Sequence, residues 1–207
     1  MSNTVFTLSN APVFYFDLGS PFAYLAAERI DALFEDTVTW QPVSLGAIFK
    51  LTGRSSWALG GPERRRAGMA DIEARAHRYG LPPMRWPDPW PSHYLMAMRA
   101  ATYAFEAGRG REFTMQAFRD AFTRGRDLSI PANVLHAAAE AGLDPSTVEA
   151  ATQDPAVKAA LKDATGAAYE RGVFGVPTVA VGDELFWGDD RLEEAAELFG
   201  SGVSRQD

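Results

Sequence analysis

The sequence predicts an α/β fold, in which a βαβ unit at the start of the chain and a ββα unit at its end share one sheet-based core. Residues 12–17 and 37–43 are rich in β-branched and aromatic residues, as strands are, and a helical pattern lies between them. Residues 178–187 read as a hairpin, and a helical pattern follows. Helical patterns dominate the long stretch between these units, so we expect a large α-helical insertion in the core.

The first strand and its helix meet at a well-specified junction. Ser20 is a favoured N-cap residue and Pro21 a favoured first helical residue, and apolar residues at helical spacing continue to about Phe34. The N-terminus of a helix concentrates free N–H groups and positive potential. This junction would therefore stabilise an anion bound next to it.

The middle of the chain is predicted to hold several helices separated by loops. Residues 44–61 contain several Gly and Ser and read as a loop with a short helical piece. A long helix follows until Gly80, the prolines of residues 84–91 exclude regular structure, and Ser92 fits the N-cap of the next helix. Further helices are expected over residues 111–124 and from near Pro131, Pro145 and Pro155.

The end of the chain returns to strands. Thr178–Val181 and Leu185–Trp187 are predicted strands joined by a tight turn. A last helix is predicted from about residue 189 to residue 199, with Asp189 or Asp190 as its cap.

This order of elements predicts how the chain divides. We expect residues 1–61 and 172–207 to form the sheet-based core and residues 62–171 to form the helical insertion, including the helix that returns to the core. Residues 1–10 and 200–207 are expected to be loose ends.

The composition argues against several classes of function. The net charge is −7 and the basic residues form no long block, which disfavours nucleic acid or an anionic membrane surface as the main partner. No apolar run approaches the roughly 20 residues that a membrane-spanning helix needs. The first twenty residues show no signal-peptide pattern, so we expect a cytoplasmic location.

The chain contains no cysteine, which restricts its chemistry. It cannot form a disulfide or use a thiol of its own, so any thiol that it uses must come from a ligand. The three histidines, His77, His93 and His136, show no spacing typical of metal ligands, and we expect no metal site.

Three motifs follow one another along the chain: Phe14–Asp17 with Ser20–Ala26, Gly172–Thr178, and Phe186–Leu192. Together they resemble the motifs of 2-hydroxychromene-2-carboxylate isomerases, which are relatives of kappa-class glutathione transferases with a DsbA-like thioredoxin fold, and Asp71–Ala76 with Gly80–Pro82 fits the middle region of that family. Dithiol oxidoreductases of this fold carry Cys-Pro-x-Cys at the start of the first helix, where this chain has Ser20-Pro21-Phe22-Ala23.

The resemblance implies glutathione as cofactor and assigns it a site. Ser20 would donate a hydrogen bond to the sulfur of glutathione and favour its ionised form, although Ser20 could also be a helix cap and nothing more. Val176 and Pro177 would be joined by a cis peptide bond and pair with the cysteinyl part; an ordinary trans proline is the alternative. Asp189, Asp190 and Arg191 would recognise the γ-glutamyl end, and we favour Asp190 for its ammonium group.

A substrate pocket is predicted with less support from the residues. Aromatic residues beside Pro and Gly could form the wall of a pocket for a flat aromatic ligand, or they could anchor the loops by packing. The Asn and Lys that the family often uses for the glycine end of glutathione are absent, and the Arg64–Arg66 and Asp71–Arg75 segments read as a solvated helix face. The candidate pocket residues are Phe22, Trp57, Trp86, Trp90 and His93.

The resemblance therefore implies a glutathione-dependent isomerase of 2-hydroxychromene-2-carboxylate type, acting on a small aromatic carboxylate from aromatic catabolism. The thiolate would add to a conjugated carbon, the bond would rotate, and elimination would follow. A kappa-like glutathione transferase or peroxidase and a non-catalytic DsbA-like binding protein remain alternatives. A homodimer is possible by resemblance.

Overall fold

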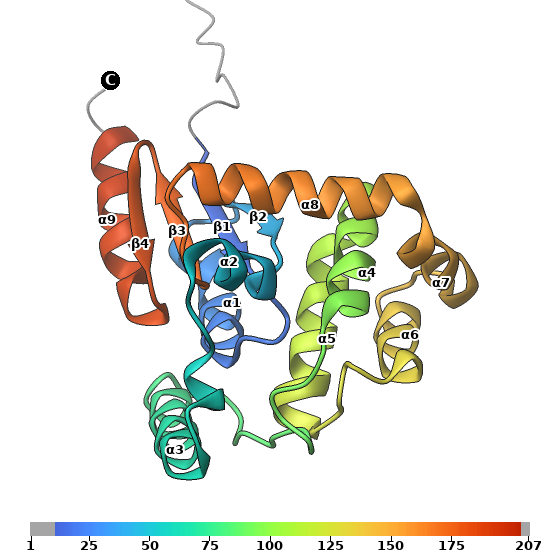
Figure 1. Cartoon of the computed structure of the whole chain (residues 1–207). Helices are drawn as coiled ribbons and strands as arrows, with labels where there is room; N and C mark the ends of the chain where they lie inside the picture. Colours follow the sequence, from blue (N-terminus) through green and yellow to red (C-terminus); the bar gives the residue numbers. More distant parts are fainter. Residues whose placement is uncertain (1–10, 204–207) are drawn as a thin grey trace, which may run out of the picture.

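A four-stranded mixed sheet with the order β2-β1-β3-β4 forms the core (Figure 1). The computed structural model describes residues 11–203, and β1 pairs in parallel with β2 and antiparallel with β3, which pairs antiparallel with β4. The βαβ and ββα units thus share one sheet, which confirms the predicted fold class. The strands are β1 (Val13–Phe16), β2 (Thr39–Pro42), β3 (Thr178–Val181) and β4 (Glu184–Trp187).

Helices cover both faces of this sheet. Side chains alternate along β1, so Phe14 and Phe16 pack in one apolar cluster while Tyr15 packs in the other. The helices α1 (Pro21–Leu33) and α9 (Leu192–Val203) pack on the first side, and α2 (Leu45–Thr52) and α8 (Pro155–Glu170) pack on the second.

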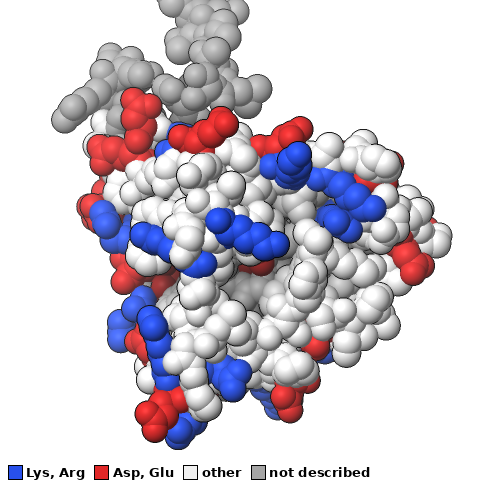
Figure 2. Space-filling model, viewed as in Figure 1, with Lys and Arg blue, Asp and Glu red and all other residues white. Residues whose placement is uncertain are grey.

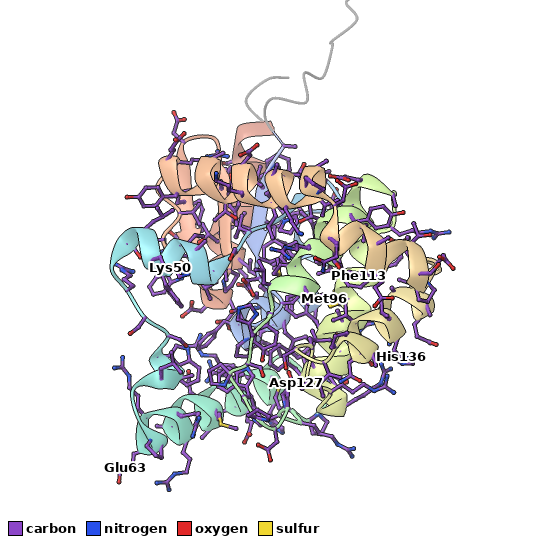
Figure 3. All side chains as sticks on the ribbon, turned by 45° about the vertical axis from the view of Figure 1, so that its right-hand side comes forward. Lys50, Glu63, Met96, Phe113, Asp127 and His136 are labelled. Atoms are coloured by element: carbon purple, nitrogen blue, oxygen red, sulfur yellow. The ribbon has the colours of Figure 1, made fainter. Side chains whose placement is uncertain are left out.

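The insertion is helical, as predicted. Each of α6, α7 and α8 begins with a proline in its first turn, where the missing N–H costs nothing. Phe113, Phe118 and Phe122 of α5 are fully buried against the core, and Figure 3 shows Phe113 among the side chains that fill this region. The helices are α3 (Pro62–Arg78), α4 (Leu95–Glu106), α5 (Gly110–Arg124), α6 (Pro131–Glu140), α7 (Pro145–Gln153) and α8.

Some expected element ends are wrong. Ser92 does not cap α4, because its hydroxyl donates to an Asp127 carboxylate oxygen at 3.2 Å and Tyr94 occupies the cap position. The 44–61 segment holds more helix than expected, namely α2 and a 3₁₀ turn, Trp57–Leu59.

The end of the chain also differs from expectation. A 3₁₀ turn, Asp189–Arg191, precedes α9; its cap position is Gly188, and neither aspartate side chain caps it. The last helix extends to Val203, so residues 200–203 are helical and not loose. The expectations for residues 1–10 and 204–207 lie outside the described residues.

The helix α8 runs from the end of the insertion back across the sheet (Figure 1). It packs against α4 and α7 on one side and against β2 and α2 on the other. The division of the chain at residues 61 and 171 remains a prediction. Within residues 11–203, none of the helices has the length and apolar character that crossing a membrane requires.

Candidate functional site

A cavity of about 870 Å³ lies next to the N-terminus of α1. This volume is near the upper end of the range for ligand pockets, roughly 300–1,000 Å³. Figure 2 shows a hollow on this face of the molecule, with basic and acidic side chains beside it. The lining comes from segments far apart in the sequence: residues 19–22, 45–64, Arg75, 90–91, 174–177 and 187–191.

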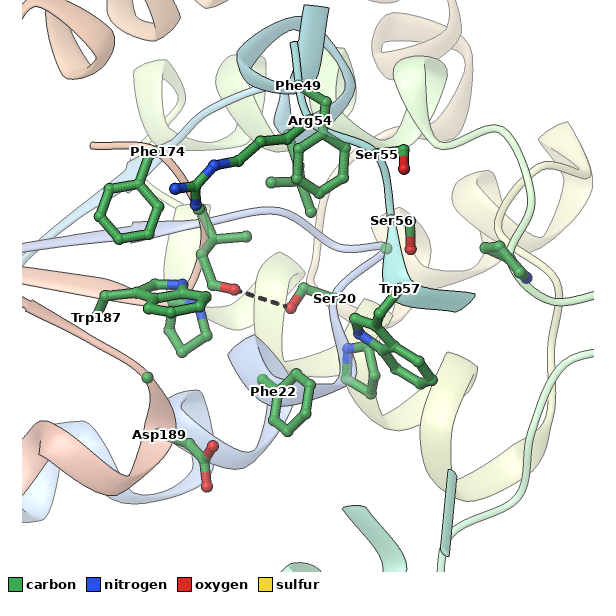
Figure 4. A pocket seen from close by; sticks show the side chains of 18 of the residues that line it. Ser20, Phe22, Phe49, Arg54, Ser55, Ser56, Trp57, Phe174, Trp187 and Asp189 are labelled. Carbon is green, nitrogen blue, oxygen red and sulfur yellow. Dashed lines mark hydrogen bonds between the residues drawn. The ribbon is translucent and has the colours of Figure 1, made fainter. Parts of the chain in front are cut away.

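Ser20 lines this pocket, between the end of β1 and the start of α1 (Figure 4). Its Oγ accepts a hydrogen bond from the Ala23 N–H at 3.2 Å, so Ser20 is the N-cap of α1 as predicted. The same hydroxyl donates to the Val176 carbonyl at 3.3 Å. The Val176–Pro177 peptide bond is cis, which confirms the expectation for that bond. The hydroxyl therefore lies between a helix N-terminus and the loop before β3.

The buried carboxyl group of Asp17 holds the backbone next to Ser20 in place. Asp17 follows β1, and its two carboxylate oxygens accept the N–H groups of Gly19 and Leu45, each at 2.8 Å. These bonds join the start of α1 to the start of α2. Burial raises the pKa of Asp17 to about 6, although both N–H groups oppose the shift.

Asp189 lines the pocket and forms a buried ion pair there. Its side chain is 1% exposed, Arg75 Nη1 donates to one oxygen at 3.0 Å, and the Tyr79 hydroxyl donates to the other at 2.9 Å. Burial raises the pKa of Asp189, although Tyr79 and Arg75 oppose this. Asp190 is 58% exposed and lies 3.3 Å from Arg75, so it is the more accessible carboxylate.

Aromatic rings line the side of the pocket next to α3. Phe22 and Trp57 lie edge to face with ring centroids 6.2 Å apart, and Trp57 lies 5.5 Å from Trp90. Trp86 packs behind Trp90 at 4.7 Å and donates its indole N–H to Glu73, and it does not line the pocket. His93 is exposed and does not line the pocket either.

The structure brings the other candidate residues together. These pocket-lining residues are Ser20, Phe22, Trp57, Trp90, Val176, Pro177, Asp189, Asp190 and Arg191.

Sequence reasoning missed several residues of the opposite rim. The Arg54 guanidinium lies 4.4 Å above the ring of Phe174, which in turn packs edge to face on Trp187 at 4.9 Å (Figure 4). Trp187 is 52% exposed, and its position next to buried Phe186 in a strand was a signal that it faces outward. Arg54 lies in a polar Gly-Ser loop and carried no such signal.

The pocket is electrically polarised. Among the described residues, neither Arg54 nor Arg64 has a carboxylate partner, although both line the pocket. Arg75, by contrast, is shared by three carboxylates, those of Asp71, Asp189 and Asp190. The arrangement suits a ligand with a cationic group at one end, carboxylate groups elsewhere and an anion near Ser20.

No metal centre is evident in residues 11–203, where no group of three or more histidine, cysteine or carboxylate side chains could hold an ion. His136 lies on α6, away from the pocket (Figure 3).

Comparisons with known proteins agree with this geometry. The model of the DSBA-like thioredoxin domain family matches residues 13–200. The 2-hydroxychromene-2-carboxylate isomerase of Sphingobium xenophagum is 30% identical over 191 residues, which are 87% of this chain and 93% of that protein. Human glutathione S-transferase kappa 1 is 26% identical over 208 residues, covering 90% of this chain and 89% of the relative.

Solved structures give the same result. The structure of a 2-hydroxychromene-2-carboxylate isomerase superposes with a TM-score of 0.80 at 28% identity and covers 94% of this chain and 96% of that chain. A probable DsbA oxidoreductase from Streptomyces coelicolor gives a TM-score of 0.75 at 20% identity, with coverages of 92% and 89%. The chain therefore belongs to the DsbA-like thioredoxin-fold family and, within it, to the 2-hydroxychromene-2-carboxylate isomerase family.

Proposed function

We propose that this protein is a glutathione-dependent isomerase of 2-hydroxychromene-2-carboxylate type. The observation that carries the proposal is the hydroxyl of Ser20, held between the N-terminus of α1 and the Val176 carbonyl in the lining of a large pocket, in a chain without cysteine. A site built to favour a thiolate, with no thiol of its own, requires a thiol ligand. The isomerase and transferase relatives support this class of function.

The charges of the pocket fit glutathione. Asp190 is the exposed carboxylate that would accept the ammonium of the γ-glutamyl end. Arg54 and Arg64, which have no carboxylate partner within residues 11–203, would hold the glycine carboxylate, in place of the Asn and Lys of the family. Asp189 would act through its bonds to Arg75 and Tyr79, because both of its oxygens are already occupied.

Ser20 would activate the bound sulfur. Its O–H would turn from the Val176 carbonyl to the sulfur, while its Oγ lone pair continues to cap α1. A hydrogen bond to a charged group contributes about 1.5–3 kcal/mol, which would lower the pKa of a bound thiol by about one to two. The helix terminus adds to this stabilisation.

The aromatic side of the pocket would hold the substrate. Phe22, Trp57 and Trp90 offer ring faces and edges beside Ser20. They would orient a flat aryl group and exclude water from the reacting atoms. When bound, glutathione would supply the thiolate that adds to a conjugated carbon of the substrate and leaves after the bond has rotated.

A second candidate is a kappa-like glutathione transferase or peroxidase, which the match to human glutathione S-transferase kappa 1 favours. Following free thiol during turnover separates the two, because isomerisation regenerates glutathione while transfer or peroxide reduction consumes it. We expect the thiol concentration to stay constant while 2-hydroxychromene-2-carboxylate is converted. Stoichiometric thiol loss would favour the second candidate.

The decisive experiment compares two serines that cap helices. Ser20 and Ser44 each accept an N–H bond at the start of a helix, from Ala23 at 3.2 Å and from Ala47 at 3.3 Å, but only Ser20 lines the pocket. We expect Ser20→Ala and Ser44→Ala to lose about 1 kcal/mol of unfolding free energy each. Only Ser20→Ala should raise the pKa of bound glutathione, followed by thiolate absorbance, and abolish turnover.

Equal turnover by the two variants would refute the role of Ser20. If calorimetry detects no glutathione binding to the unmodified protein, the proposal is wrong and a non-catalytic binding protein is the better description.

A further inference from the structure

The indole ring of Trp57 rests on the backbone of α3 at Gly68. A Cβ atom at Gly68 would lie 2.1 Å from Cζ3 of Trp57 and 2.6 Å from its Cε3. Real Cβ atoms essentially never make contacts this short, so a side chain at residue 68 would have to displace a neighbour. The ring has reached this position because residue 68 is glycine.

The helix is less free to move than the ring. Ile72 and Ala76 of α3 are buried in the core, and Arg75 ties the same helix to Asp189 at 3.0 Å. Trp57 is only half-buried, and it belongs to a short 3₁₀ turn between α2 and α3. A methyl group on residue 68 would therefore push the ring away from α3.

The pocket lies on the far side of the ring. Trp57 lines the pocket whereas Gly68 does not, so at Gly68 the indole stands between the backbone of α3 and the cavity. The ring is also in contact with Phe22 and Trp90, which line the same side. A ring displaced from Gly68 would enter the cavity and narrow the space next to Phe22.

We propose that Gly68 determines the width of the aromatic end of the pocket, and thereby the size of the aromatic group that the pocket admits. Gly68 is a positioning residue, because it acts through Trp57 and does not itself touch the ligand. The proposal deepens the proposed function, and for ligands in which the aromatic group is attached to glutathione it rests on that function. The width of the pocket does not depend on glutathione, and the test uses this difference.

The test compares Gly68→Ala with the matched control Gly166→Ala. Gly166 lies inside α8, a Cβ atom there would meet nothing within 4 Å, and the residue is outside the pocket. Binding is measured by calorimetry with S-methylglutathione and S-(1-naphthylmethyl)glutathione, which share the tripeptide and differ in the group on sulfur, a methyl group in one and a naphthylmethyl group in the other. Benzoate and 2-naphthoate form a second pair without the tripeptide.

We expect Gly68→Ala to bind the methyl conjugate like the unmodified protein and to lose at least about tenfold in affinity for the naphthyl conjugate, since a misfit of even one methylene has that effect. Gly166→Ala should bind both conjugates normally. Replacing Trp57 by Phe in the Gly68→Ala background should restore naphthyl binding, because the smaller ring leaves room for the new methyl group. A crystal structure of Gly68→Ala should show the indole shifted toward Phe22.

Other outcomes would overturn the proposal. Equal losses for both conjugates would indicate a general structural defect, and unchanged naphthyl binding would show that Gly68 does not set the width. If the unmodified protein binds neither conjugate, the proposed glutathione function is wrong, and benzoate and 2-naphthoate then test the width of the pocket by themselves. In that case Gly68→Ala must lose affinity for 2-naphthoate relative to benzoate. If Gly68→Ala does not fold, Trp57→Phe must shift the preference toward the larger ring, and failure to do so refutes the idea.

Discussion

Asp17 shows how a single residue can serve a site without lining it. Its carboxyl group is buried and accepts two backbone N–H bonds, but no cation is paired with it in the described part of the chain. Both bonds end on residues of the pocket lining, Gly19 and Leu45. Burying this acid is unfavourable because it is poorly solvated, but its two hydrogen bonds fix the starts of the two helices that shape the pocket.

The raised pKa of Asp17 predicts how stability depends on pH. The folded protein holds this proton up to about pH 6, whereas the unfolded chain releases it near 3.8. The contribution of Asp17 to stability is therefore present below about pH 4, falls as the pH rises to 6, and is constant above that; the loss is roughly 3 kcal/mol. Urea unfolding of the unmodified protein and of Asp17→Asn between pH 4 and 7 should show this difference, and parallel profiles would contradict it.

Among single residues, Ser20 could be predicted from the sequence because helix caps are local features. The aspartates could be predicted through motif similarity. The sequence could not reveal that the Asp189 carboxylate is buried and accepts hydrogen bonds from Arg75 and Tyr79. Those residues lie more than a hundred positions away, and Arg75 fits a solvated helix face equally well. The partner of an ion pair is decided by packing, which a local pattern does not contain.

Among the elements, α3 is held to the core by a small polar network. Arg75 and Tyr79 of this helix bind Asp189, and the Arg29 guanidinium of α1 lies 3.8 Å above the Tyr79 ring while donating to the Asp189 carbonyl at 2.9 Å. The network explains how a helix with few buried residues, Ile72 and Ala76, keeps a fixed position beside the pocket.

We expect Arg75→Leu to cost roughly 3 kcal/mol of unfolding free energy, because it leaves the buried Asp189 carboxylate without its cation. Arg66→Leu, an exposed change on the same helix, should stay within about 0.5 kcal/mol. Replacing both Arg75 and Asp189 by leucine should recover part of the loss. Urea unfolding of the four proteins tests this, and equal effects of the two single arginine changes would be the contrary result.

Whether the end of a helix could be predicted from the sequence depended on how local its signal is. The starts of α6, α7 and α8 were predictable because proline in a first turn acts without help from the rest of the fold. The start of α4 was not, because the hydroxyl of Ser92 is bound by Asp127 from a distant loop. Long-range bonds override local preferences wherever a capping side chain has a competing partner.

For the molecule as a whole, ligand binding should appear as added stability. Glutathione at 100 times its dissociation constant should raise the unfolding free energy by about 2.7 kcal/mol. Its dimethyl ester lacks both carboxylates, including the glycine carboxylate that Arg54 and Arg64 would hold, so we expect weaker stabilisation at equal concentration and a smaller effect of salt. Thermal unfolding with both compounds checks this, and equal shifts would exclude the two arginines as carboxylate ligands.

The path of α8 has a consequence for how the molecule could be rebuilt. The hydroxyl of Thr165, in the middle of α8, accepts the Ser44 N–H at 2.9 Å and donates to the Leu161 carbonyl at 2.6 Å. The same helix thus packs against α4 and α7 of the insertion and against α2, which supplies Leu45 and Phe49 to the pocket lining (Figure 1). A chimera that takes its insertion helices from a relative must therefore take α8 from the same relative. Otherwise α2 would lose its contacts with α8, and the part of the pocket lining that α2 supplies would shift while the sheet stays intact.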